Sequence, residues 1–106
     1  MSALRYVVLH HTGIDQPHYD LMFERQPGSM LATVRCSNWP PESGTIFERI
    51  ADHRTSYLDY EGAVSRNRGE VTRVESGTCT VEVDENAVLL TLSSGAQFRV
   101  PGLWQK

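Results

Sequence analysis

The sequence predicts a mostly β fold, a small antiparallel β-barrel of about eight strands with one or two short helices. Short segments rich in β-branched and aromatic residues recur along the chain, and turn-forming residues separate them. A length of 106 residues with 40% hydrophobic content allows one modest core. Closing the sheet into a barrel would leave no unpaired strand edge. We therefore expect a single domain that spans residues 1–106.

The first half of the chain is expected to contain four strands. Apolar and β-branched residues dominate the first strand, and the turn formers Gly13 and Pro17 separate it from the second. A Pro-Gly pair precedes the third strand, and a loop with two consecutive prolines precedes the fourth. Residues 51–61 fit either a short helix or an irregular crossover. The four strands are expected at residues 4–11, 19–24, 30–36 and 45–50.

The last third of the chain is expected to form a meander of four more short strands. Polar turn sequences interrupt the apolar alternation at residues 75–77, 84–86 and 93–95. Each of these sequences contains a glycine or an asparagine, the residues that tolerate turn conformations best. The strands between them are expected at residues 70–74, 78–83, 87–92 and 96–100.

Composition and charge narrow the classes of function. A formal net charge of −3 argues against a protein that coats duplex nucleic acid, so any such contact would be confined to a strand end. The two cysteines, Cys36 and Cys79, lack C-x-x-C spacing and are expected to be reduced and buried. No segment has the length and apolar character of a signal peptide or a membrane span. We expect a cytoplasmic protein with no membrane partner.

The sharpest chemical signal is the H-x-D step His18-Tyr19-Asp20. On a strand, alternation places His18 and Asp20 on one face and Tyr19 on the other. A second imidazole, from His11 or its neighbour His10, lies just upstream. Two imidazoles and one carboxylate form an open three-ligand site for a divalent transition metal, which makes His11, His18 and Asp20 the predicted ligands. The alternative is the polar outer face of a hairpin with unrelated histidines.

A second polar group is expected around residues 52–62. His53 and Tyr57 are four residues apart, so they are adjacent on one face if this segment is helical. An imidazole can bind a phosphate oxygen or act as a general acid, and a phenol can donate to the same oxygen. The alternative is a capped surface helix with Tyr57 packed on the barrel.

Other charged residues have two interpretations each. Glu24 and Glu61 either orient metal-bound histidines through hydrogen bonds or are ordinary solvated carboxylates. Arg49 either approaches a phosphate or is an ordinary surface arginine.

These segments, in this order, resemble the 3′-phosphoesterase domain of bacterial DNA ligase D and its stand-alone bacterial and archaeal relatives. The resemblance spans roughly residues 5–80, most of the chain. The combination of H-Y-D-L-M-F-E with D-H-x3-Y-L-D-Y-E-G is far more specific than either half alone. The matching pieces are Tyr6-Val7-Val8-Leu9-His10-His11, His18-Tyr19-Asp20-Leu21-Met22-Phe23-Glu24, Asp52-His53 and Tyr57-Leu58-Asp59-Tyr60-Glu61-Gly62.

The resemblance implies a compact β-barrel with a Mn²⁺-dependent site, Zn²⁺ being the alternative ion. It implies removal of a 3′-terminal ribonucleoside, and then of the 3′-phosphate, from DNA or primer strands. By position, His11, His18 and Asp20 would hold the metal with support from Glu24. His53 and Tyr57 would contact the scissile phosphate, with His53 as the proton donor. The implied partner is a nucleic-acid 3′ end (DNA or a primer–template), with any repair ligase or polymerase supplied in trans.

The chain departs from the family pattern at its phosphate-binding cations. Met22 and Thr45 stand where the family has arginines, and Asn38 stands where it has a lysine. Three other arginines, at different backbone positions, are candidates to replace them. These are Arg49, Arg66 and Arg68. The alternative function is therefore a catalytically impaired metal-binding β-barrel that serves as a binding or interaction module.

Overall fold

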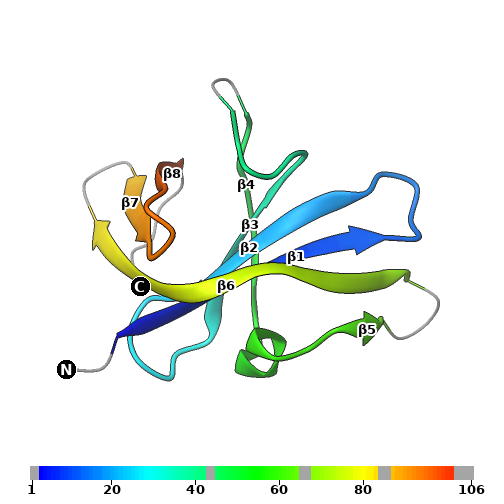
Figure 1. The fold of residues 1–106 in the computed structure, drawn as a ribbon, viewed down its shortest axis with the longest axis horizontal. Helices are drawn as coiled ribbons and strands as arrows, with labels where there is room; N and C mark the ends of the chain where they lie inside the picture. Colours follow the sequence, from blue (N-terminus) through cyan, green and yellow to red (C-terminus); the bar gives the residue numbers. More distant parts are fainter. Residues whose placement is uncertain (1–2, 43–44, 65–67, 84–86, 102–106) are drawn as a thin grey trace.

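The computed structural model describes residues 3–42, 45–64, 68–83 and 87–101. These residues form eight antiparallel strands and one short 3-10 helix, so the mostly β prediction is confirmed (Figure 1). The elements in chain order are β1 (Leu4–Thr12), β2 (His18–Glu24), β3 (Leu31–Cys36), β4 (Glu48–His53), η1 (Thr55–Leu58), β5 (Gly62–Ala63), β6 (Glu70–Val83), β7 (Ala87–Leu92) and β8 (Gln97–Pro101).

The sheet is an open, curled half-barrel, so the predicted closed barrel is not confirmed. Its strands follow the order β4-β3-β2-β1-β6-β7-β8, and β5 pairs beside them with β6. Among the described residues, no backbone pairing joins the end strands β4 and β8. Aromatic side chains span that gap instead. The ring of Phe98 on β8 lies 5.5 Å from that of Trp39 and 6.1 Å from that of Phe47, measured between centroids.

The long strand β6 corrects the prediction of two strands separated by a turn at residues 75–77. Figure 1 shows it running without a break from β5 at one end to β7 at the other. Glu75 accepts hydrogen bonds from the Tyr6 hydroxyl (2.5 Å) and from Trp39 Nε1 (2.9 Å). Burial raises the pKa of Tyr6 to about 12, so its hydroxyl keeps the proton that it donates. The polar residue that suggested a turn is therefore anchored within the sheet.

Gly77 is a glycine because of close packing and not because a turn requires it. A Cβ at this position would lie 2.4 Å from Ser93 Oγ and 3.3 Å from a ring carbon of Tyr6. Strand β6 can consequently pair with β1 as far as Cys79 and with β7 from Cys79 onward. One strand thus joins the two parts of the sheet.

Both faces of the central strands are buried. On the inner face of the curl the core includes Tyr6, Val8, Leu21, Phe23 and Val34. A smaller cluster lies on the other face, where the 3-10 helix η1 packs beside β1. Tyr57 and Val64, which are partly buried, pack against this cluster. It contains Val7, Leu9, Met22, Leu31, Leu58 and Val71. We call this second side the η1 face, and the candidate site lies at its edge.

The two cysteines are buried and unpaired, as predicted. Burial raises the pKa of both thiols to about 11, so they are inert neutral groups in the core. Within the described part of the chain, no helix combines the length and the apolar character needed to cross a bilayer.

The packing at Gly77 gives a test of the continuous β6 strand. Gly77→Ala should lower the free energy of unfolding by about 1–3 kcal/mol, because the added methyl group meets the Ser93 hydroxyl. Ser93→Ala removes that hydroxyl, which accepts a hydrogen bond from the Thr78 amide (3.2 Å). Urea denaturation of both single variants and the double variant measures the coupling. We expect the double variant to be less destabilised than the sum; strictly additive effects would contradict the close contact.

Candidate metal centre

The β1–β2 ladder places the three predicted metal ligands together. His11 is directly opposite His18 in the register, and Asp20 is opposite Leu9. Residues opposite each other in an antiparallel pair share a face, so all three side chains lie on the η1 face. One ligand atom from each of them lies within 4.8 Å of the others. His10, the alternative imidazole, is on the other face, with its ring stacked 4.3 Å from that of Tyr19.

Backbone carbonyls determine which ring nitrogens carry protons. His18 Nδ1 lies 3.0 Å from the carbonyl oxygen of Gln16, and His11 Nε2 lies 2.6 Å from that of Arg68. A carbonyl only accepts, so both of these nitrogens must donate. In the neutral form of each ring, the lone pair therefore lies on the other nitrogen. Histidines that bind metals are oriented by hydrogen bonds of this kind.

His18 Nε2 is the clearest sign of a missing ligand. Among the described residues it is the one buried side-chain nitrogen or oxygen with no hydrogen-bond partner. Asp20 Oδ2 lies 3.6 Å from it, too far for a normal hydrogen bond. Burial lowers the pKa of His18 below its usual 6.5, so the ring is neutral at neutral pH. A lone pair and a carboxylate oxygen that face each other across this gap suit a cation.

The donor set fits a divalent transition ion. Imidazole nitrogens together with one carboxylate oxygen suit Zn²⁺, Mn²⁺ or Fe²⁺ and leave coordination positions open. Metal–ligand bonds of about 2.0–2.2 Å require the three donor atoms to lie roughly 3–4 Å apart. The observed spread of up to 4.8 Å is close to that range, and small rotations of the side chains would close it.

Close packing of two loops positions His11. Gly69 has φ +80°, and a Cβ on it would lie 2.1 Å from the carbonyl oxygen of Thr12. Gly13, with φ +76°, would bring a Cβ to 3.1 Å from the Cα of Gly69. These contacts exclude larger residues and bring the neighbouring Arg68 carbonyl against His11. The end of β1 with Gly13 and the segment at residues 68–69 therefore fix the orientation of the ring.

Arg35 is a site residue that the sequence analysis missed. It is opposite Asp20 in the β2–β3 register. Its Nε lies 2.9 Å from Asp20 Oδ1 and its Nη2 lies 3.4 Å from Oδ2. Asp20 is 4% exposed, so this guanidinium offsets the cost of burying the carboxylate. A prediction of the β2–β3 pairing would have identified Arg35. If Glu24 pairs with Leu31, the antiparallel register places Arg35 opposite Asp20.

His53 and Tyr57 are in contact, although they do not lie on one helix as the prediction of their contact assumed. His53 ends β4, and Tyr57 belongs to η1. Their rings meet edge to face with centroids 5.3 Å apart. His53 Nδ1 lies 3.0 Å from both the Ala51 carbonyl oxygen and Thr33 Oγ1. Nδ1 therefore donates, and Nε2 carries the lone pair of the neutral ring.

A β-bulge turns His53 toward the metal-ligand side of the sheet. Arg49 pairs with Val34 and Ile50 pairs with Thr33, so a regular ladder would pair Leu31 with residue 52. The register shifts there, and Leu31 pairs with His53 instead. The extra residue puts His53 on the η1 face. Thr33, which contacts the His53 ring, is opposite Met22, two residues (about 7 Å) along β2 from Asp20. Leu31, the backbone partner of His53, is opposite Glu24, four residues along β2 from Asp20.

Glu24 and Glu61 are not brought to the metal ligands. Glu24 is 1% exposed, and its oxygens accept from the Arg5 backbone N–H and guanidinium and from the Gly28 N–H. It lies four residues along β2 from Asp20, roughly 13 Å away. Glu61 accepts a hydrogen bond from the Arg73 backbone N–H (2.7 Å). Both carboxylates thus bind groups of the sheet and its turns, and among the described residues neither accepts a hydrogen bond from a predicted metal ligand.

The three arginines proposed to bind phosphate have different positions. Arg49 pairs with Val34 on the opposite face, and its Nη2 lies 2.9 Å from Asp52 Oδ1. Arg66 lies outside the described residues. The Arg68 carbonyl oxygen accepts a hydrogen bond from His11 Nε2. Arg68 also lines an open pocket of about 400 Å³ together with Arg54, Tyr57 and Tyr60.

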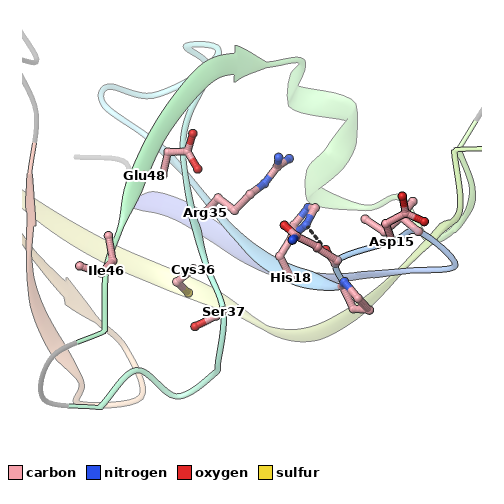
Figure 2. Close-up of a pocket in the computed structure, with 10 residues that line it drawn as sticks. Asp15, His18, Arg35, Cys36, Ser37, Ile46 and Glu48 are labelled. Atoms are coloured by element: carbon pink, nitrogen blue, oxygen red, sulfur yellow. Dashed lines mark hydrogen bonds between the residues drawn. The ribbon is translucent and has the colours of Figure 1, made fainter.

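A larger pocket of about 820 Å³ opens beside the metal ligands. Figure 2 shows His18 and Arg35 in its lining, with the Arg35 guanidinium directed toward the His18 side of the pocket and Ile46 at the opposite side. Asp15 and Glu48 add carboxylates to the lining. The imidazole of His18 and the guanidinium of Arg35 therefore border the same pocket.

Comparison with known proteins assigns no family to the chain. No protein-family model matches the sequence, and no curated protein matches it significantly.

Metal binding can be tested with neighbouring histidines as matched variants. His18→Ala and His11→Ala should weaken Mn²⁺ and Zn²⁺ binding at least about 100-fold, because each removes one of three ligands. His10→Ala should leave the affinity unchanged, since that ring stacks on Tyr19 on the other face. Isothermal titration calorimetry measures all three variants. Equal affinity for wild type and His18→Ala would exclude the site.

The lowered pKa of His18 predicts a dependence of stability on pH. An unfolded chain binds a proton at His18 near pH 6.5, whereas the folded chain does so only at lower pH. The unfolded state therefore binds more protons in that window, and stability falls as the pH drops below about 6.5. His18→Asn should remove this contribution. Urea denaturation at about pH 7.5 and about pH 5.5 should show a smaller loss for the variant than for wild type; equal losses would contradict the pKa shift.

Proposed function

We propose that the chain is a metal-dependent phosphoesterase that acts on 3′ ends of DNA or RNA in repair, removing a 3′-ribonucleoside or a 3′-phosphate. One observation carries the proposal. His11, His18 and Asp20 converge with an unsatisfied lone pair on His18, on the same sheet face as the His53–Tyr57 pair. A metal-binding motif without phosphate chemistry would not need that second pair.

The metal would be held by His11, His18 and Asp20, with Mn²⁺ as the expected ion and Zn²⁺ as the alternative. Once bound, such an ion polarises a phosphoryl oxygen and lowers the pKa of coordinated water. The chain's own contribution is orientation. The Gln16 and Arg68 carbonyls hold the two rings, and Arg35 holds the carboxylate.

His53 and Tyr57 are suited to the phosphate itself. The Ala51 carbonyl and Thr33 hold His53 through Nδ1, which leaves Nε2 free to serve the substrate. In its imidazolium form, His53 donates the Nε2 proton to the leaving oxygen. The Tyr57 hydroxyl donates to a non-bridging oxygen on which negative charge increases. Their edge-to-face contact keeps the two donors side by side.

The charge of the chain favours binding of a strand end over binding along a duplex. A net charge of −3 offers little attraction for a long phosphate backbone. Positive charge is instead available locally, from the metal and from Arg35, Arg54 and Arg68, which line the two pockets. A repair ligase or polymerase would act in trans on the trimmed end.

A second candidate function is a metal-binding module without catalysis. One observation favours it: Met22, which is apolar and 2% exposed, lies on the face between the metal ligands and the Thr33–His53 contact. Arg35, the arginine that contacts Asp20, is already paired with that carboxylate. Such a module would bind metal and nucleic-acid ends without turnover.

The activity test uses a primer–template with a 3′-phosphate and a second one with a 3′-terminal ribonucleotide. We expect the Mn²⁺-loaded protein to convert both primers to shortened or 3′-hydroxyl products, resolved by denaturing gel electrophoresis. His53→Ala should reduce the rate about 100-fold or more, because it removes the proton donor. Tyr57→Phe should cause a smaller loss, since it removes one hydrogen-bond donor.

His10→Ala serves as the control and should keep wild-type activity, because its ring stacks on Tyr19 away from the ligands. Metal binding without turnover of either primer would support the binding module. Turnover that persists in both His18→Ala and His53→Ala would indicate a contaminating enzyme and reject the proposal.

A further inference from the structure

Arg35 has more hydrogen-bonding capacity than its ion pair uses. A guanidinium has five N–H donors in a planar fork. Nε and Nη2 donate to the two oxygens of Asp20. Within the described part of the chain, Nη1 has no hydrogen bond, and the side chain is 36% exposed. Figure 2 shows this guanidinium in the lining of the large pocket, near the His18 ring.

The charge balance of the centre calls for an anionic ligand. Two of the three predicted metal ligands are imidazoles, which bind a metal without contributing charge, and the one carboxylate is already paired with Arg35. A divalent ion held by this set therefore keeps a net positive charge close to +2. A centre of that charge beside an open pocket favours a dianion. Without the ion, Asp15 and Glu48 in the same pocket would repel such a ligand.

We infer that Arg35 is both the positioning residue for Asp20 and the anion-binding residue of the centre, and that its ligand is a phosphate monoester dianion. Arg35 Nε and Nη2 continue to donate to Asp20, and the remaining N–H groups of Arg35 donate to a phosphate oxygen, while the organic part of the ligand occupies the large pocket. Met22 on β2 offers no positive charge to such a ligand, and Arg35 supplies that charge from the neighbouring strand β3. This inference rests on the proposed metal centre but not on catalysis.

The test measures binding of phenylphosphonate, a phosphate mimic that cannot be hydrolysed, at saturating Mn²⁺. Wild type, Arg35→Gln, Arg35→Lys and Arg99→Gln are compared by isothermal titration calorimetry, after circular dichroism has shown that each is folded. Arg99→Gln is the matched control, because it removes the same charge from an exposed position on β8. Metal affinity is measured separately for each variant.

We expect wild type and Arg99→Gln to bind the phosphonate alike, and only when Mn²⁺ is present. Arg35→Gln should weaken phosphonate binding by about 10- to 100-fold at saturating metal. Arg35→Lys, which keeps the charge but loses the fork, should lie between them, and it preserves the test if Arg35→Gln fails to fold.

Three results would overturn the inference. Unchanged phosphonate affinity in both Arg35 variants would leave Arg35 with a structural role only, even if metal affinity falls. Metal binding by wild type without phosphonate binding would exclude the anion site, and failure to bind metal would exclude both this inference and the proposed function. Arg35-dependent phosphonate binding without turnover of primers would overturn the phosphoesterase proposal alone.

Discussion

The candidate centre depends on the register between β1 and β2. A slip of one residue in this ladder would move His18 and Asp20 to the opposite face from His11. Burial alone does not fix the register, because apolar residues cover both faces of these strands in their middle. Polar contacts at the ends do so. Glu24, 1% exposed, joins the Arg5 backbone and guanidinium to the following turn at Gly28, and removing these donors would leave a buried carboxylate without partners.

Two local irregularities then complete the η1 face. The bulge in β4 turns His53 to the side on which Asp20 lies, whereas a regular ladder would point it to the inner core. The close approach of Gly69 to Thr12 brings a carbonyl to His11. Each one orients a histidine ring by fixing the proton on one of its nitrogens, so the sheet determines both where the rings lie and which lone pairs they offer.

Local patterns predicted most strands, because alternation and turn residues act over a few neighbours. The same local logic failed at residues 75–77, where Glu75 and Gly77 have roles set by distant partners, Tyr6, Trp39 and Ser93. The open edge between β4 and β8 also depends on long-range geometry. The H-x-D step was visible because one strand carries both residues. Arg35 was not, because it is adjacent to Asp20 only through the β2–β3 pairing.

The electrostatics of the centre explain how it can exist before an ion binds. A buried carboxylate without a partner would be costly, and Arg35 offsets that cost at Asp20. A buried imidazolium would be costly as well, and the lowered pKa keeps His18 neutral. The two lone pairs and the carboxylate are therefore held in place without strong repulsion among them. Since none of these groups would neutralise a divalent ion fully, a cation bound as proposed would leave positive charge for an anion on the same face.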